Sequence, residues 1–90
     1  MLIFEWDPEK ARENEQNHGI TFAQATEVFD DDHSSSVPDP DHSVDEERYL
    51  IFGTSKQGTH LVVSYTGRGD RIRLISARSM TPRERRAYEQ

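Results

Sequence analysis

Four arginines lie within eleven residues in the second half of the chain, and their spacing suits phosphate binding. They are Arg68, Arg71, Arg73 and Arg78, and Tyr65 comes shortly before them. Alternate residues of a strand share a face, so Arg71 and Arg73 would lie about 7 Å apart on one side of a sheet. Guanidinium groups bind phosphate oxygens with two parallel hydrogen bonds. The cluster therefore indicates a phosphate-binding surface, although a solvated arginine face is the simpler alternative.

The position of Arg78 depends on how its strand ends. Strict alternation places Arg78 on the side of Ile72 and Leu74, away from Arg71 and Arg73. Either the strand has ended by Ala77 or a bulge turns the chain over, and the pattern leaves both alternatives open.

Side chains that transfer protons are also present. Cleavage of RNA without a metal needs a base for the 2′-OH, cations for the phosphate and an acid for the leaving 5′ oxygen. The histidines, tyrosines and carboxylates of interest are His18, His33, His42, His60, Tyr49, Tyr65, Glu46 and Glu47. Each also has a structural interpretation: His18 as a helix C-cap, Glu47 in a local ion pair with Arg48, and Tyr65 as strand packing.

An acidic segment that also carries histidine raises the question of a metal site. It contains Asp30, Asp31, Asp32, His33, Asp39, Asp41, His42 and Asp45. Such oxygen ligands suit Mg²⁺, Mn²⁺ or Ca²⁺, but the spacing lacks the glycine and final glutamate of a calcium loop. We expect a solvated loop or a docking surface for a basic partner, and no metal or other cofactor.

The elements that position these residues follow from local patterns. Residues 2–6 predict a strand, and Asp7-Pro8 predicts a helix to about Asn17 with Gly19 as its C-cap. Thr21 to Gln24 form a capping box for a second helix that ends near Asp30, followed by a loop with a short edge strand at 34–37.

The second half predicts three strands and a last helix. The strands span residues 48–55, 60–66 and 71–78, with glycine-containing connectors at 56–58 and 67–70. Thr81-Pro82-Arg83-Glu84 is another capping box, which opens a helix to about Glu89. The order β-α-α-(β)-β-β-β-α predicts one α+β domain over residues 1–90, a mainly antiparallel sheet with helices on one face.

Charge and composition limit the classes of function. Residues 1–45 hold two Lys/Arg against twelve Asp/Glu (net −10), and residues 46–90 hold nine against five (net +4). This division predicts one basic and one anionic partner. The absence of cysteine excludes disulfides, and with no signal peptide and no membrane-spanning run in view we expect a cytoplasmic protein.

Ordered segments over nearly the whole chain resemble the BrnT family of toxins. They are Phe4-Glu5-Trp6-Asp7-Pro8 with Lys10; Asn14 and His18-Gly19-Ile20 with Phe22 and Ala25; Val28-Phe29-Asp30; Glu46-Glu47-Arg48-Tyr49 with Gly53; Leu61–Tyr65-Thr66; Arg71-Ile72-Arg73; Ile75-Ser76-Ala77-Arg78; and Glu84-Arg85 with Tyr88. The most specific parts are Ile-Ser-Ala-Arg and the Glu-Arg…Tyr tail.

The resemblance implies a RelE-like fold and a metal-independent endoribonuclease that arrests growth. It implies a DNA-binding BrnA-type antitoxin, contact with DNA only through that antitoxin, and a homodimer within the complex as one option. Arg71, Arg73 and Arg78 would hold the scissile phosphate, Arg48 and Arg68 would extend the RNA surface, and His18, Glu47 and Tyr65 would be the acid/base candidates.

Two departures from the family pattern leave other functions open. Asn17 stands where the family usually has a lysine, and Gly67 where it often has an acidic residue. The loss of that lysine and the acidic first half favour an alternative, a non-catalytic binding module that acts with the antitoxin in transcriptional autoregulation. A nuclease that uses a metal at the acidic segment is a third alternative.

Overall fold

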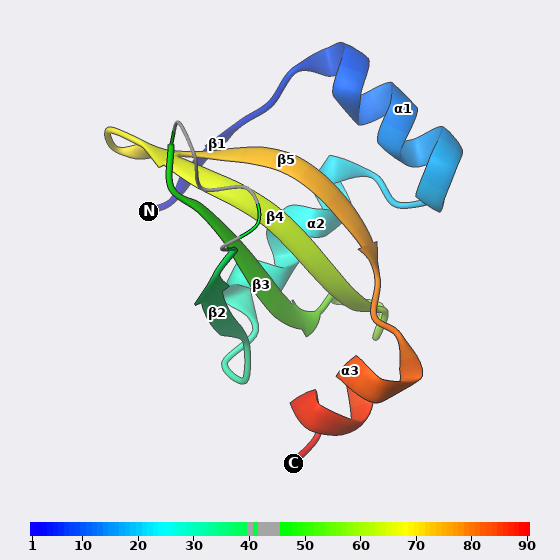
Figure 1. Cartoon of the computed structure of the whole chain (residues 1–90). Coiled ribbons are helices and arrows are strands. Elements are labelled where there is room, and N and C mark those ends of the chain that lie inside the picture. Colours follow the sequence, from blue (N-terminus) through cyan, green and yellow to red (C-terminus); the bar gives the residue numbers. More distant parts are fainter. Residues whose placement is uncertain (40, 42–45) are drawn as a thin grey trace.

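Five strands form one sheet in the order β1-β5-β4-β3-β2 in the computed structural model, which describes residues 1–39, 41 and 46–90 (Figure 1). The elements are β1 (Ile3–Glu5), α1 (Pro8–His18), α2 (Phe22–Thr26), the 3-10 helix η1 (Glu27–Asp30), β2 (Ser35–Pro38), β3 (Arg48–Thr54), β4 (His60–Arg68), β5 (Arg71–Ser79) and α3 (Pro82–Tyr88). β1 runs parallel to β5, and the other neighbouring strands are antiparallel. The predicted order of elements is confirmed.

The helix ends follow the predicted capping residues. Asp7 accepts a hydrogen bond from the Glu9 amide at 2.8 Å, and Gly19 ends α1 in the left-handed region with a φ of 70°. The second helix is shorter than expected, because α2 ends at Thr26 and the chain continues as η1. The connector expected at 67–70 is also shorter, since Gly67 and Arg68 extend β4 and the turn consists of Gly69 and Asp70.

One face of the sheet, which we call the core face, packs against α2 and η1. The buried cluster on this face joins residues of α2 and η1 to residues of β3, β4 and β5. Its members are Ile20, Phe22, Ala25, Val28, Ile51, Leu61, Val63, Leu74 and Ala77. Gly53 allows η1 to approach the sheet closely, because a Cβ at Gly53 would lie only 2.6 Å from Cγ1 of Val28. Three of these nine core residues, Phe22, Ala25 and Val28, thus come from α2 and η1.

A bulge in β5 decides which side chains face the core. Ser64 pairs with Ser76 and Tyr65 pairs with Leu74, so Ile75 is an extra residue without a partner of its own in this ladder. Leu74 and Ala77 consequently both face the core although they are three residues apart. Of the two alternatives for the end of this strand, the bulge is the one the structure adopts.

The helices do not all lie on one face, which corrects the expectation from sequence. Thr54 and His60 pair across β3 and β4, and Tyr88 of α3 contacts both of them. These strand residues alternate with the core residues Gly53 and Leu61, so α3 covers one end of the opposite face. The capping box and Pro82 predict that α3 forms, but not which face it covers.

Among the described residues, no helix is long and apolar enough to span a membrane.

The polar helix α1 is attached to the sheet through a buried asparagine. The Nδ2 of Asn14 donates to the carbonyls of Ile20 (3.0 Å) and Ala77 (2.9 Å), and its Oδ1 accepts from the Ala77 amide at 3.0 Å. β1 pairs with β5 only as far as Arg73, so the edge of β5 beyond it needs other partners. The side-chain amide of Asn14 satisfies that edge as a neighbouring strand would.

Replacement of Asn14 by leucine should destabilise the protein by about 3 kcal/mol, because it leaves buried backbone groups at Ala77 and Ile20 without partners. Urea unfolding of the two proteins measures this difference. Asn17→Leu on the exposed side of the same helix is the control, with an expected change of less than about 0.5 kcal/mol. Equal stability of Asn14→Leu and wild type would contradict the assigned role.

Candidate functional site

Five arginines from three strands lie on one face of the sheet, opposite the core face. Arg48 and Arg73 both pair with Thr66 of β4, and Arg68 pairs with Arg71. The bulge brings Arg78 to the same side, where it pairs with Val62. We call this surface the arginine face. It unites the five arginines predicted from sequence: Arg48, Arg68, Arg71, Arg73 and Arg78.

Carboxylates on the same face already contact several of these arginines. Glu5 of β1 lies opposite Arg73, whose Nη1 is 2.9 Å from Glu5 Oε2. The Nη1 of Arg71 lies 3.7 Å from Glu5 Oε1, and Arg68 lies 3.6 Å from Glu46. Glu5 shows that the arginine face can hold an anionic group between two guanidinium groups, with one oxygen toward each.

Arg78 is held more firmly than the others. Its Nη1 and Nη2 donate to the two carboxylate oxygens of Glu84 at 2.8 and 2.9 Å. The hydrogen bond from Arg78 lowers the pKa of Glu84 to about 2, and the same contact raises the pKa of Arg78. Glu84 also accepts from the Thr81 amide in the capping box. The Ile-Ser-Ala-Arg and Glu-Arg segments thus join α3 to the sheet.

A groove of about 340 Å³ runs over the middle of the arginine face. Its lining residues are Asp39, Asp41, Arg48, Leu50, Ser64, Ile75, Ser76 and Arg78. Asp39 is buried, and its amide donates to the carbonyl of Arg48 at 2.8 Å. The groove therefore combines guanidinium groups with hydroxyl and carboxylate groups, so its lining suits a polar ligand better than an apolar one.

Tyr65 and Glu47 lie away from the arginines, on the side of the core face. The ring of Tyr65 stands between Phe29 (5.1 Å) and Tyr49 (5.5 Å), and its hydroxyl bonds to Ser36 Oγ. Tyr49 donates to Glu47 at 2.7 Å, which raises the pKa of Tyr49. Alternation with Leu61 and Val63 was the signal in the sequence that Tyr65 faces the core.

The described histidines are not grouped with the arginines. His18 is exposed at the end of α1, next to the C-cap glycine. His60 packs edge-on against Tyr88 and lies 3.6 Å from Glu89, so it helps to hold α3. Of the three acid/base candidates from sequence, the structure joins Glu47 to Tyr65 through Tyr49 and leaves His18 apart from both.

Asp31 of the acidic segment stabilises its own loop and attaches that loop to β3 and α3. Asp31 accepts from the amides of His33 (2.9 Å) and Thr54 (2.8 Å) and from the hydroxyl of Tyr88. Burial alone would raise the pKa of Asp31, but these hydrogen bonds outweigh it and lower the pKa. Within the described residues no group of three His, Cys, Asp or Glu is placed to hold a metal ion. His42 and Asp45 lie outside the described residues.

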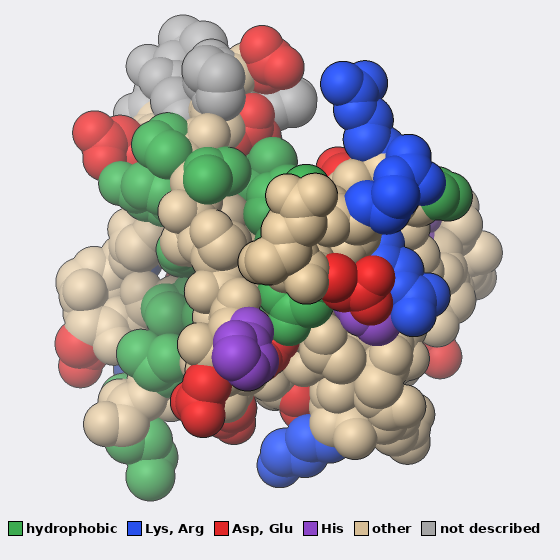
Figure 2. Space-filling view, turned by 90° about the horizontal axis from the view of Figure 1, so that it is seen from below, with side chains coloured by type: hydrophobic (Ala, Val, Ile, Leu, Met, Phe, Trp, Pro, Cys, Tyr) green, Lys and Arg blue, Asp and Glu red, His purple; other side chains and the backbone are tan. Residues whose placement is uncertain are grey.

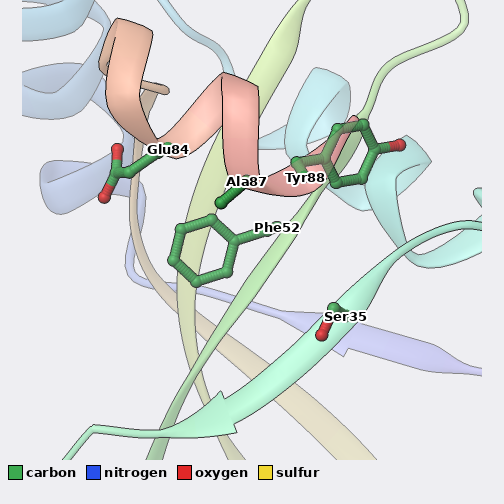
Figure 3. A pocket seen from close by; sticks show the side chains of 5 residues that line it. All are labelled: Ser35, Phe52, Glu84, Ala87 and Tyr88. Carbon is green, nitrogen blue, oxygen red and sulfur yellow. The ribbon is translucent and has the colours of Figure 1, made fainter. Parts of the chain in front are cut away.

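An apolar pocket of about 260 Å³ separates α3 from the edge of the sheet (Figure 3). Phe52 lies beneath Ala87, Tyr88 stands on the other side, and Ser35 of β2 borders the opening. Seen from the α3 end, hydrophobic side chains gather on one side of the molecule and most visible Lys and Arg side chains on the other (Figure 2). The apolar pocket adjoins the arginine face at Glu84, which lines the pocket and pairs with Arg78.

Sequence reasoning did not identify Glu5, Glu84 and Asp39 as residues of this site. Glu5 becomes visible only when β1 is known to pair with β5, since the two residues of that ion pair are 68 positions apart. Glu84 was predicted only as a capping residue. Its ion pair with Arg78 was not predicted, because the bulge decides on which face Arg78 lies. Asp39 was considered only as a member of the acidic segment, which was interpreted as a solvated loop, a docking surface or a metal site.

Comparison with known proteins identifies related proteins at the levels of sequence family and of fold. A family model described as the ribonuclease toxin BrnT of type II toxin–antitoxin systems matches residues 6–84. The fold is similar to the 1.1 Å crystal structure of the Brucella abortus ribonuclease toxin BrnT, with 20% identity and a TM-score of 0.70 over 90% of this chain and 99% of that chain. The search of curated proteins finds no match.

The ion pair between Glu84 and Arg78 predicts a pH-dependent stability. Because the pKa of Glu84 is lowered from 4.5 to about 2 in the folded state, its contribution is complete above pH 4.5 and disappears as the pH falls toward 2. Glu84→Gln should cost about 1 kcal/mol at pH 7, since the half-exposed pair is screened by water. Thermal unfolding of both proteins from pH 7 to pH 2 should show the difference vanish, and a constant difference would contradict the assignment.

Proposed function

The chain belongs to the BrnT family, the ribonuclease toxins of type II toxin–antitoxin systems, and from this premise we propose that its arginine face binds RNA at the phosphate to be cleaved. One observation supports this proposal most directly: five arginines of β3, β4 and β5 share a face, and two of them, Arg48 and Arg78, line a groove. The contacts of Arg71 and Arg73 with Glu5 are what the same guanidinium groups would make with a phosphate oxygen.

The arginines have different roles in this proposal. Arg71 and Arg73 stabilise the negative charge that builds up on the phosphate during cleavage, because positive groups fixed in advance act most strongly there. Arg48 and Arg68 bind flanking phosphates. Arg78 adds positive charge to the groove while Glu84 occupies its paired N–H groups. Glu47 and Tyr65 lie on the other side of the sheet, so we assign proton transfer to a group on the arginine face.

We propose that cleavage needs no metal, since guanidinium groups can supply the positive charge that a metal would otherwise provide. Activity that persists in EDTA is the expected result. We also propose that the protein acts in the cytoplasm, where its RNA substrate would be found, and that residues 1–90 act as one domain around the hydrophobic cluster described above.

A type II toxin has an antitoxin protein as its partner, and we propose that this partner is of the BrnA type and binds DNA for the pair. β2 is the outer strand of the sheet, and its four residues are exposed. Exposed strand edges pair readily with an extended segment of another chain. The net charge of −10 over residues 1–45 favours a basic segment, which would place an apolar side chain in the pocket of Figure 3.

A specific observation favours a second candidate function. Glu5, Glu46 and Glu84 pair with four of the five arginines within the chain. A protein with such internal pairs could act without catalysis, as a module that assembles with the antitoxin and tunes repression of transcription. This function predicts that the chain produced alone is harmless.

Loss of the two central arginines should relieve toxicity and slow RNA cleavage. Wild type, induced without its antitoxin, should arrest growth and cleave RNA, whereas Arg71→Ala/Arg73→Ala should cleave about 100-fold more slowly. The control is Arg83→Ala/Arg86→Ala, which removes two exposed arginines of α3 and should behave as wild type. Normal growth with wild type would support the non-catalytic module, and arrest by the double variant equal to wild type would contradict the role of the arginine face.

A charge placed in the apolar pocket should weaken antitoxin binding and leave the enzyme intact. Ala87 is exposed and lines the pocket, so Ala87→Glu should raise the Kd for the antitoxin at least about tenfold by burying a carboxylate at the interface. Ala23→Glu, at an exposed position of α2, is the matched control. Calorimetric titration measures the Kd of both variants for the antitoxin. An unchanged Kd for Ala87→Glu would show that the antitoxin does not bind at this pocket.

A further inference from the structure

Glu5 is held on the arginine face at a place where it can act on a bound phosphodiester. The parallel pairing of β1 with β5 sets Glu5 beside Arg73, with one carboxylate oxygen directed to Arg73 and the other to Arg71. The side chain keeps 24% of its surface exposed, and that of Arg71 keeps 56%. The carboxylate is therefore fixed by two guanidinium groups and still accessible to a ligand.

We propose that Glu5 is the general base of the RNA cleavage, an inference that rests on the proposed function. Both described contacts of Glu5 use the Nη1 atoms of its arginines. A guanidinium has five N–H donors in a fixed fork, so a phosphate can bind through the Nε and Nη2 side while Nη1 keeps its contact with Glu5. The ribose attached to that phosphate then lies next to the carboxylate.

The chemical step balances without any further reactant except water. A carboxylate oxygen of Glu5 takes the proton of the 2′-OH, and the 2′ oxygen forms a bond to phosphorus as the bond from phosphorus to the 5′ oxygen breaks. The products are a 2′,3′-cyclic phosphate and a 5′ oxygen that takes a proton from water. The hydroxide formed from that water removes the proton from Glu5 and restores the carboxylate.

Other carboxylates on the face are less suited to this role. Both oxygens of Glu84 accept hydrogen bonds from Arg78, and a carboxylate with a pKa of about 2 is a weak base. Glu46 lies 3.6 Å from Arg68, whose side chain is 51% exposed at the end of β4. Glu5 is the carboxylate that touches two arginines of the predicted phosphate site.

A comparison of Glu5→Gln with Glu9→Gln tests the proposal. Glu9 also pairs with an arginine, Arg12 at 3.0 Å, but it lies on α1. Single-turnover cleavage of an RNA oligonucleotide from pH 4.5 to pH 9 should be at least about 100-fold slower for Glu5→Gln and unchanged for Glu9→Gln. The rise of the wild-type rate with pH on the acid side should disappear in Glu5→Gln. Binding of a 2′-O-methyl oligonucleotide, which cannot be cleaved, should be equal or tighter.

The possible outcomes separate this proposal from the proposed function. If wild type cleaves and Glu5→Gln cleaves within about threefold of it, Glu5 only pairs strands β1 and β5 and the proposal is wrong. If Glu5→Gln loses stability, Glu5→Asp replaces it in the test because it keeps the negative charge. The cleavage rate of Glu5→Asp should be lower than that of wild type but should still rise with pH on the acid side. A cleavage rate of Glu5→Asp that does not change with pH overturns the proposal. If wild type leaves RNA intact, the proposed function fails first, and the role of Glu5 fails with it.

Discussion

The single extra residue at Ile75 determines what each face of the sheet carries. Without it, Ala77 would leave the core and Arg78 would enter it, because the side chains of a strand alternate strictly. With the bulge, Leu74 and Ala77 both pack beneath the helices, and Arg73 and Arg78 share the opposite face. The nine residues of β5 thus supply side chains to the core and arginines to the opposite face.

The same strand explains how a helix of almost entirely polar sequence can belong to a folded domain. α1 has one buried residue, Asn14, and its contribution is hydrogen bonding rather than apolar area. The short β1 leaves part of the β5 edge unpaired, and Asn14 completes it. Both neighbours of β5 on that side therefore bring polar groups: Asn14 toward the backbone, and Glu5 toward the arginines.

Local patterns in the sequence predicted the elements well, because caps, turns and alternation act over a few residues. The meander, the N-cap at Thr21, the capping box of α3 and the grouping of Arg71 with Arg73 were all correct. The parallel pairing of β1, the side on which α3 packs and the contacts of Glu5 were not predicted, since they depend on residues far apart in the chain. Tyr65 lies between these cases: its alternation with Leu61 and Val63 indicated the core face, but its closeness in sequence to the arginines suggested the opposite.

The distance along the chain between Glu5 and Arg73 has a consequence for synthesis. The first residues leave the ribosome long before β5 is made, and β1 has no partner until β5 follows. A nascent chain therefore carries the carboxylate of Glu5 without its guanidinium partners, and these groups come together only after β5 has been made.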